Sequence, residues 1–211
     1  PAAGVAGALM YEKLTNGIFL EVGGTSTDIS CVKDGKVMVK YAEVGGHKTY
    51  LTSLDVRTVG IGGGSMIQIE NGKISDVGPR SVHIAGLDYE VYSDSADIVD
   101  PVLCAIKPTD TDPDYAYVQC SNGKKFALSL AGAANLAGYV KDEDYAKGNV
   151  EAARKAWKPL ADNMGMSVEE AAKEALRLSA VKNGKVVKAL IEDYNMDPRT
   201  IVLVGGGGGA A

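Results

Sequence analysis

The segment EVGGTSTD at residues 21–28 constrains the fold of this chain more than any other. Apolar runs at residues 18–22 and 28–32 flank its two glycines, which predicts a strand, a tight turn and an antiparallel strand. Glycine lets backbone N–H groups approach an anion without a Cβ in the way, hydroxyls add donors, and carboxylates can hold a hydrated Mg²⁺. The segment therefore predicts a phosphate-binding hairpin, and the alternative is an ordinary hairpin with polar surface residues.

The first half of the chain is otherwise rich in strand and turn patterns. Residues 1–14 are small and apolar and predict a packed helix. Asp34-Gly35 predicts a hairpin turn that leads to a third antiparallel strand at residues 37–41. Residues 54–68 are strand-rich, and Asn71-Gly72 predicts a second hairpin before a strand at residues 73–77. Residues 81–114 show no clear periodicity and stay unassigned.

Helical spacing of apolar residues dominates the last third of the chain. It predicts three helices at residues 149–162, 168–179 and 186–194, the second with the capping-box pattern Ser167 to Glu170. A buried strand at residues 201–204 then opens into five glycines. Because such a loop normally leads into a further helix, we expect the sequence to stop inside the fold.

Composition and charge exclude several functional classes. The 211 residues are 45% apolar, enough for a core, and 27 acidic against 22 basic residues argue against nucleic acid as a partner. No apolar run reaches the roughly 18 residues that span a bilayer, and no signal peptide is recognisable, so we expect no membrane and a cytoplasmic location. Three widely spaced cysteines, Cys31, Cys104 and Cys120, fit reduced thiols.

Four sequence blocks, in this order, resemble the hydantoinase/oxoprolinase family. The first is PAAGVAGA at residues 1–8 followed by EVGGTSTD, and the second is TVGIGGGS at residues 58–65. The third is VGPRS at residues 77–81, and the last runs from Ala153 through GMSVEEAA and MDP to VLVGGGGG, which ends at residue 209. One block would be weak evidence, whereas four in family order are specific.

This resemblance implies a fold from the actin-like ATPase superfamily. The expected architecture is α/β, an RNase H-like lobe with a mixed sheet and helices, plus a smaller inserted subdomain. Residues 1–40 and 150–211 would form the lobe, and residues 41–149 would form the insertion. The family's first phosphate loop lies on an N-terminal lobe that this sequence lacks, so we expect weak or no ATP hydrolysis by this chain alone.

The resemblance also implies roles for individual residues. Residues near the β- and γ-phosphates of ATP would be Gly23, Gly24, Thr25, Ser26 and Thr27. Residues near adenosine would be Gly205, Gly206, Gly207 and Gly208, unless these glycines form a flexible tail. Glu21 and Asp28 would hold Mg²⁺, with Glu21 standing where the family usually has aspartate. A ligand contact and a structural turn remain equally good interpretations of Gly62 to Gly64.

The function implied for the intact protein is ATP-dependent hydrolysis of a cyclic amide of the hydantoin or 5-oxoproline type. No catalytic base is assigned, and Asp94, Asp97 and Asp100 are interpreted as a solvated acidic loop. The segment VHIAGLDYEVYSDS after Ser81 departs from the family pattern, which leaves the substrate open. Alternatives are an actin-like ATPase that remodels a partner enzyme, and a non-catalytic scaffold lobe that contacts a second subunit.

Overall fold

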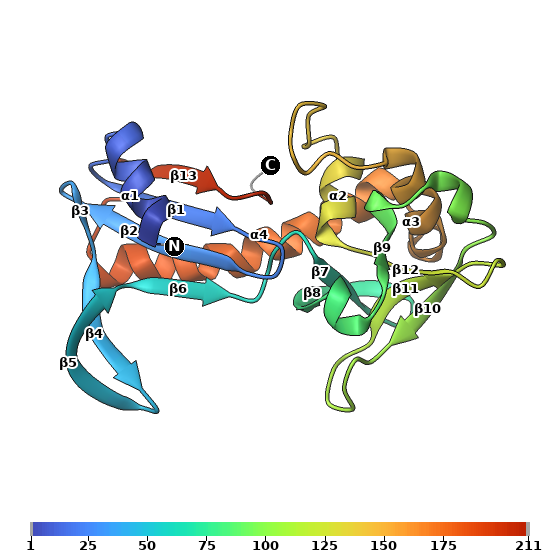
Figure 1. Ribbon diagram of the computed structural model, residues 1–211, viewed down its shortest axis with the longest axis horizontal. Coiled ribbons are helices and arrows are strands. Elements are labelled where there is room, and N and C mark those ends of the chain that lie inside the picture. The colour runs from blue at the N-terminus through green and yellow to red at the C-terminus, as the bar shows by residue number, and fades with distance from the viewer. Residues whose placement is uncertain (1, 210–211) are drawn as a thin grey trace.

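A computed structural model describes residues 2–209 of the protein and shows two packed units joined by a long helix (Figure 1). The first unit contains a mixed sheet in the order β13 (Val202–Gly206), β1 (Gly17–Val22), β2 (Thr27–Lys33) and β3 (Lys36–Val37), with β6 (Val56–Val59) also paired to β2. β1 runs parallel to β13 and antiparallel to β2. Both ends of the chain therefore build the same sheet, and the strands predicted around the glycine turn are confirmed.

Helices cover both faces of this first sheet, and strand alternation sorts its side chains between them. α1 (Ala2–Tyr11) confirms the predicted N-terminal helix and packs Val5 against Phe19 and Val32 on one face. On the other face, Ile18 and Ile29 pack with Leu190 of α4 (Val168–Asp193).

The second unit is built around a larger sheet of six strands. Its order is β8 (Lys73–Ser81), β7 (Ser65–Glu70), β11 (Tyr115–Gln119), β12 (Lys125–Ala127) and β9 (Asp88–Tyr89), and β10 (Val102–Ile106) pairs with β11. α2 (Leu130–Leu136), α3 (Val150–Met164) and the short 3-10 helix η1 (Val82–Ala85) pack against it, and two further 3-10 helices, η2 (Glu90–Tyr92) and η3 (Ser95–Asp97), pack against α3. The predicted turn at Asn71-Gly72 is confirmed, with φ of 52° and 71°.

The third strand predicted at residues 37–41 is wrong as a single element. β3 ends at Val37, while β4 (Val39–Val44) turns away and pairs with β5 (His47–Leu54) in a separate hairpin (Figure 1). β6 takes the place beside β2 instead, with Thr58 opposite Asp28. The sequence pattern at residues 37–41 correctly indicates extended backbone. However, the strand that pairs with β4 is β5, which comes later in the chain.

The two helices predicted at residues 168–179 and 186–194 form one continuous helix, α4. Its start is confirmed, because Ser167 and Glu170 make a reciprocal capping box. Gly184 lies within it, and an internal glycine costs a helix only about 1 kcal/mol relative to alanine. α4 buries Ala171 and Ala175 in the second unit and Leu190 in the first, so packing at both ends offsets that cost.

The chain crosses between the units at residues 60–64 and along α4. β6 belongs to the first sheet, whereas α3, predicted as a helix and confirmed, packs against η2, η3 and β10 of the second unit. The division into residues 1–40 with 150–211 and residues 41–149 stays a prediction. Across residues 2–209, none of the helices has the length and apolar character needed to cross a bilayer.

Candidate functional site

A cavity of about 570 Å³ lies where the two units meet. Backbone from three glycine-rich segments forms one wall, and α2, α4 and the loop at residues 137–149 form the others. The glycine wall consists of Gly23, Gly24, Gly62, Gly63, Gly64, Gly208 and Gly209. These glycines come from the ends of the chain and from the crossing between the units.

The turn between β1 and β2 forms the centre of the glycine wall. Gly23 N–H donates to the carbonyl of Ser26 at 2.9 Å, which closes the turn. A Cβ on Gly24 would meet no atom within 4 Å, so this residue borders open space. Thr27 is buried, and its hydroxyl donates to the carbonyl of Ile61 at 2.7 Å. The predicted hairpin is thus closed, and its threonine ties it to the next glycine segment.

Residues 62–64 pack directly against this turn. The N–H groups of Gly63 and Gly64 donate to the carbonyls of Gly23 and Gly24 at 3.0 and 2.7 Å. A Cβ on Gly62 would lie 2.5 Å from the carbonyl oxygen of Gly23, a distance that side chains do not tolerate. These glycines therefore form a turn and also line the cavity.

The C-terminal glycines complete the wall. Gly209 N–H donates to the carbonyl of Val22 at 3.0 Å, and Gly207 has φ of +93°. A Cβ on Gly207 would lie 2.4 Å from the same Val22 oxygen. The segment is hydrogen-bonded to β1 and is not a loose tail over these residues.

Four of the residues predicted to contact nucleotide line the cavity, namely Gly23, Gly24, Thr27 and Gly208. The remaining ones lie beside it: Thr25 is exposed at the turn, Ser26 is half-buried, and Gly205 and Gly206 belong to β13, followed by Gly207.

The carboxylates predicted to hold metal, Glu21 and Asp28, are not among the residues that line the cavity. Glu21 and Asp28 are directly opposite each other across β1 and β2, so their side chains share the face covered by α1. Asp28 Oδ1 accepts a hydrogen bond from the hydroxyl of Thr58 at 2.5 Å. Within residues 2–209, no group of three or more His, Cys, Asp or Glu side chains is arranged to hold a metal ion. The metal role of this pair stays a prediction.

Tyrosines form a second part of the cavity lining, the tyrosine wall, which no sequence pattern predicted; Tyr89 and Tyr145 lie beside Gly64 and Gly208 of the glycine wall. Four of the chain's ten tyrosines line the cavity: Tyr89, Tyr92, Tyr139 and Tyr145. Asn135 of α2 holds the loop that carries the last two, because its Nδ2 donates to Ala146 O at 3.1 Å and its Oδ1 accepts from Gly148 N–H at 3.0 Å. α2 has only seven residues, most of them small, and the one available signal was its N-cap, Ser129.

A buried carboxylate lies behind this wall. Glu90 is fully buried and accepts hydrogen bonds from Ser129 N–H at 2.9 Å and from the indole of Trp157 at 3.0 Å. Burial raises the pKa of Glu90 to about 7, against the lowering effect of hydrogen bonds from Trp157 and Ser129. This group connects η2, α2 and α3 below the tyrosines and has no access to the cavity.

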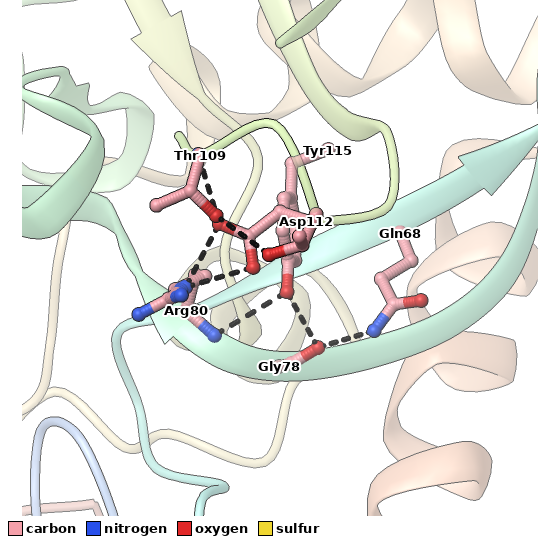
Figure 2. Close-up of polar contacts among 7 residues, drawn as sticks. Gln68, Gly78, Arg80, Thr109, Asp112 and Tyr115 are labelled. Carbon is pink, nitrogen blue, oxygen red and sulfur yellow. Dashed lines mark hydrogen bonds and ion pairs between the residues drawn. The ribbon is translucent and has the colours of Figure 1, made fainter. Parts of the chain in front are cut away.

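The block VGPRS supports the glycine wall from behind. Gly78 O accepts hydrogen bonds from Tyr115 Oη at 3.0 Å and from Gln68 Nε2, and Arg80 Nε donates to Asp112 at 2.9 Å (Figure 2). A Cβ on Gly78 would lie 2.6 Å from the carbonyl oxygen of Gly60. Close approach of these two backbones positions the residues that lead into Gly62.

The acidic residues at 94, 97 and 100 act as surface groups. Asp94 caps η3 by accepting from Ala96 N–H, and Asp97 pairs with Lys124 at 2.6 Å. Asp100 accepts from the hydroxyl of Ser121 at 3.4 Å.

Two solved structures share this fold. A nucleotide-free acetone carboxylase, described as ATP-dependent, superposes with a TM-score of 0.63 at 18% identity over 95% of this chain and 25% of its own. The ATP-dependent caprolactamase of Pseudomonas jessenii gives a TM-score of 0.55 at 22% identity over 98% of this chain and 26% of its own. At these identities the likeness concerns the fold alone, a mixed α/β architecture.

Sequence comparison extends over the whole chain. Caprolactamase subunit alpha of P. jessenii is 27% identical over 217 residues, which cover 100% of this chain and 27% of that protein. An uncharacterized protein of Methanocaldococcus jannaschii is 27% identical over 228 residues, which cover 99% of this chain and 29% of that protein. The chain thus spans just over a quarter of the length of these relatives. The hydantoinase/oxoprolinase family model matches residues 1–211, and the chain belongs to the hydantoinase/oxoprolinase family.

Proposed function

We propose that the glycine wall binds the phosphates of ATP in an RNase H-like lobe of the actin-like type. The observation that carries this proposal is the stacking of two glycine turns, joined by hydrogen bonds from Gly63 and Gly64, beside the open space at Gly24. Backbone N–H groups in such a cradle suit a polyphosphate, since no Cβ keeps the anion away. Gly23, Gly24, Thr25, Ser26 and Thr27 would surround the β- and γ-phosphates.

The C-terminal glycines would take the nucleoside side of the same ligand. Gly208 lines the cavity, and Gly205, Gly206 and Gly207 lead to it. This leaves the tyrosine wall and the face of α4 that lines the cavity for the rest of the ligand.

Glu21 and Asp28 would hold Mg²⁺ through water. Their carboxylates share one face of the hairpin, one residue pair before Val22 and Thr27 at the glycine turn, and Mg²⁺ in phosphate sites commonly takes only one or two carboxylates. The ion would neutralise charge on the phosphates.

In the intact protein, the proposed reaction is ATP-dependent opening of a cyclic amide. The γ-phosphoryl group passes to the carbonyl oxygen of the amide and ADP leaves. Water then adds to the activated carbon, and the C–N bond breaks as the amine nitrogen takes up a proton. A second water hydrolyses the resulting acyl phosphate to a carboxylate and inorganic phosphate. Belonging to the hydantoinase/oxoprolinase family supports this reaction class, and likeness to a caprolactamase subunit supports a lactam substrate and a second subunit. The chain described here would contribute the ATP-binding site to this reaction.

Calorimetric titration with Mg-ATP tests the binding site. A Cβ at position 24 meets no protein atom within 4 Å, so we expect Gly24→Val to fold normally while its side chain extends into the space proposed for phosphate. Gly7→Val on α1 is the control, because Gly7 also has open space around it and lies outside the cavity. We expect binding to be lost in Gly24→Val alone.

Equal binding by wild type and Gly24→Val would reject the phosphate site. The reaction is tested on the intact protein by measuring ring-opened product from caprolactam, hydantoin and 5-oxoproline. ATP consumption with no ring-opened product would reject the hydrolase.

A further inference from the structure

α4 presents a polar side chain to the cavity that the phosphate site does not use. Leu176, Ser179 and Asn183 lie on one face of this helix and all line the cavity. Asn183 Oδ1 is buried and has no hydrogen-bond partner among residues 2–209. A buried acceptor without a donor is unfavourable, so the position favours a ligand that brings a donor.

The turn of α4 that carries Asn183 is anchored by the neighbouring Lys182. Lys182 Nζ pairs with Asp76 at 2.6 Å and donates to the carbonyl of Val77 at 2.9 Å, which anchors this turn of α4 to β8. The Asn183 amide therefore lies at the cavity on an anchored helix. A side chain that distinguishes between ligands needs such a rigid support.

The tyrosine wall favours a flat ligand beside this amide. Tyr89 and Tyr92 lie with ring centroids 5.7 Å apart, and Tyr92 Oη donates to Ala146 O at 3.3 Å. Tyr145, on the same loop as Ala146, is 99% exposed, yet its ring comes within 3.9 Å of where a Cβ on Gly208 would be. An exposed aromatic ring at the mouth of a cavity can stack on a planar heterocycle.

We propose that Asn183 is a specificity-determining residue that selects adenine by accepting a hydrogen bond from its 6-amino group. This inference rests on the proposed function, since the phosphates at the glycine wall bring the base to α4. A purine with oxygen at C6 would place an acceptor against Oδ1 and would be disfavoured. Ser179, one turn earlier on α4, offers a hydroxyl to the same ligand, and Tyr145 covers the base.

Titration with three ligands separates the base from the phosphates. Mg-ATP, Mg-ITP and Mg-tripolyphosphate share the phosphate chain, and ATP and ITP differ at the C6 substituent and the adjacent N1 proton. We expect wild type to bind ATP about tenfold more tightly than ITP, the value of one hydrogen bond. Asn183→Leu should bind ATP and ITP equally and tripolyphosphate as wild type does, whereas Asn183→Asp keeps an acceptor and should retain the preference for ATP.

Matched variants test whether the same substitutions outside the cavity change ligand affinity. Asn163→Leu makes the same substitution on α3, outside the cavity, and should leave all three affinities unchanged. Tyr145→Ala should weaken ATP and ITP equally without affecting tripolyphosphate, and Tyr50→Ala on the exposed hairpin should affect none.

Equal affinity of wild type for ATP and ITP, or an unchanged ratio in Asn183→Leu, would overturn the role of Asn183 and leave the phosphate site intact. If Tyr145→Ala weakens binding of caprolactam but not of ATP, the tyrosine wall is an amide site and the inference fails. Failure of wild type to bind any of the three phosphate ligands would overturn the proposed function as well.

Discussion

The carboxylate of Glu90 accepts a hydrogen bond at 3.0 Å from the indole Nε1 of Trp157, and both side chains are fully buried. The two residues come from η2 and α3, and Ser129 at the start of α2 donates to the same carboxylate. One acidic group thus joins three elements that carry or support the tyrosine wall.

We expect Glu90→Ala to lower the free energy of unfolding by about 1–3 kcal/mol, because the Ser129 N–H and the indole N–H lose their acceptor. Glu90→Gln keeps an acceptor and should cost less. Chemical denaturation at pH 7 measures both, and equal losses in the two variants would contradict the assigned hydrogen bonds.

The buried carboxylate of Glu90 should also make the free energy of unfolding depend on pH. The pKa of Glu90 is raised from 4.5 to about 7, so the folded state holds a proton that the unfolded state has released between these values. Its contribution is therefore complete below pH 4.5 and is lost as the pH rises through about 7. Glu90→Gln should flatten this part of the profile, measured as unfolding midpoints from pH 4 to 8.

A pair of glycine substitutions tests packing against helix propensity. A Cβ on Gly132 of α2 would lie 1.9 Å from Glu90 Oε1, so Gly132→Ala should destabilise the protein by about 1–3 kcal/mol through overpacking. Gly184 of α4 has open space around it, so Gly184→Ala should stabilise it by about 0.5–1 kcal/mol. Thermal unfolding of both variants checks the opposite signs.

Two adjacent glycines should differ in their effect on ATP affinity. A Cβ on Gly62 would lie 2.5 Å from the Gly23 carbonyl and would push the two glycine turns apart, whereas one on Gly63 would meet only the methyl group of Ala131 at 4.0 Å. We expect Gly62→Ala to weaken Mg-ATP binding tenfold or more and Gly63→Ala to have a small effect. Similar affinities in the two variants would show that the contact between the turns does not shape the site.

A buried ionic network at the base of the β4–β5 hairpin should make the protein sensitive to acid. Asp55 is buried and accepts hydrogen bonds from Arg57 at 3.1 Å and from the hydroxyl of Tyr194 at 2.9 Å. Its other carboxylate oxygen forms an ion pair with Lys40 Nζ at 2.7 Å. Burial by itself would raise the pKa of Asp55, but hydrogen bonds from Lys40, Arg57 and Tyr194 outweigh it and lower the pKa below 3.8.

The stability from Asp55 is therefore present above pH 3.8 and is lost as the pH falls through the lower folded-state pKa. Asp55→Asn should cost about 2 kcal/mol at pH 7 and progressively less in acid. Asp197→Asn, which breaks an exposed pair with Arg199, is the control and should change nothing measurable. Denaturant midpoints at pH 7 and pH 3 compare the two.

Local patterns predicted the elements whose geometry is set within a few residues. The glycine turn at Gly23 and Gly24, the turn at Asn71-Gly72 and the capping box at Ser167 all depend on the conformation of short segments, and the structure contains each of them. The partner of β4 and the continuity of α4 depend on contacts between distant residues, and there the predictions were wrong.

The sequence by itself determined the family, through its four ordered blocks. It also determined the strand–turn–strand unit and the glycine segments, because glycine and capping preferences act through backbone conformation and short-range hydrogen bonds. The family resemblance already predicted that Gly23 and Gly208 contact one ligand, whereas only the tertiary structure decided that Gly63 joins them and that Tyr145 and Asn183 line the same cavity. The four cavity tyrosines lie between residues 89 and 145, and their positions follow from the buried contacts of Glu90 and Asn135. Proximity across such distances arises when the two units pack around α4, and no local pattern encodes it.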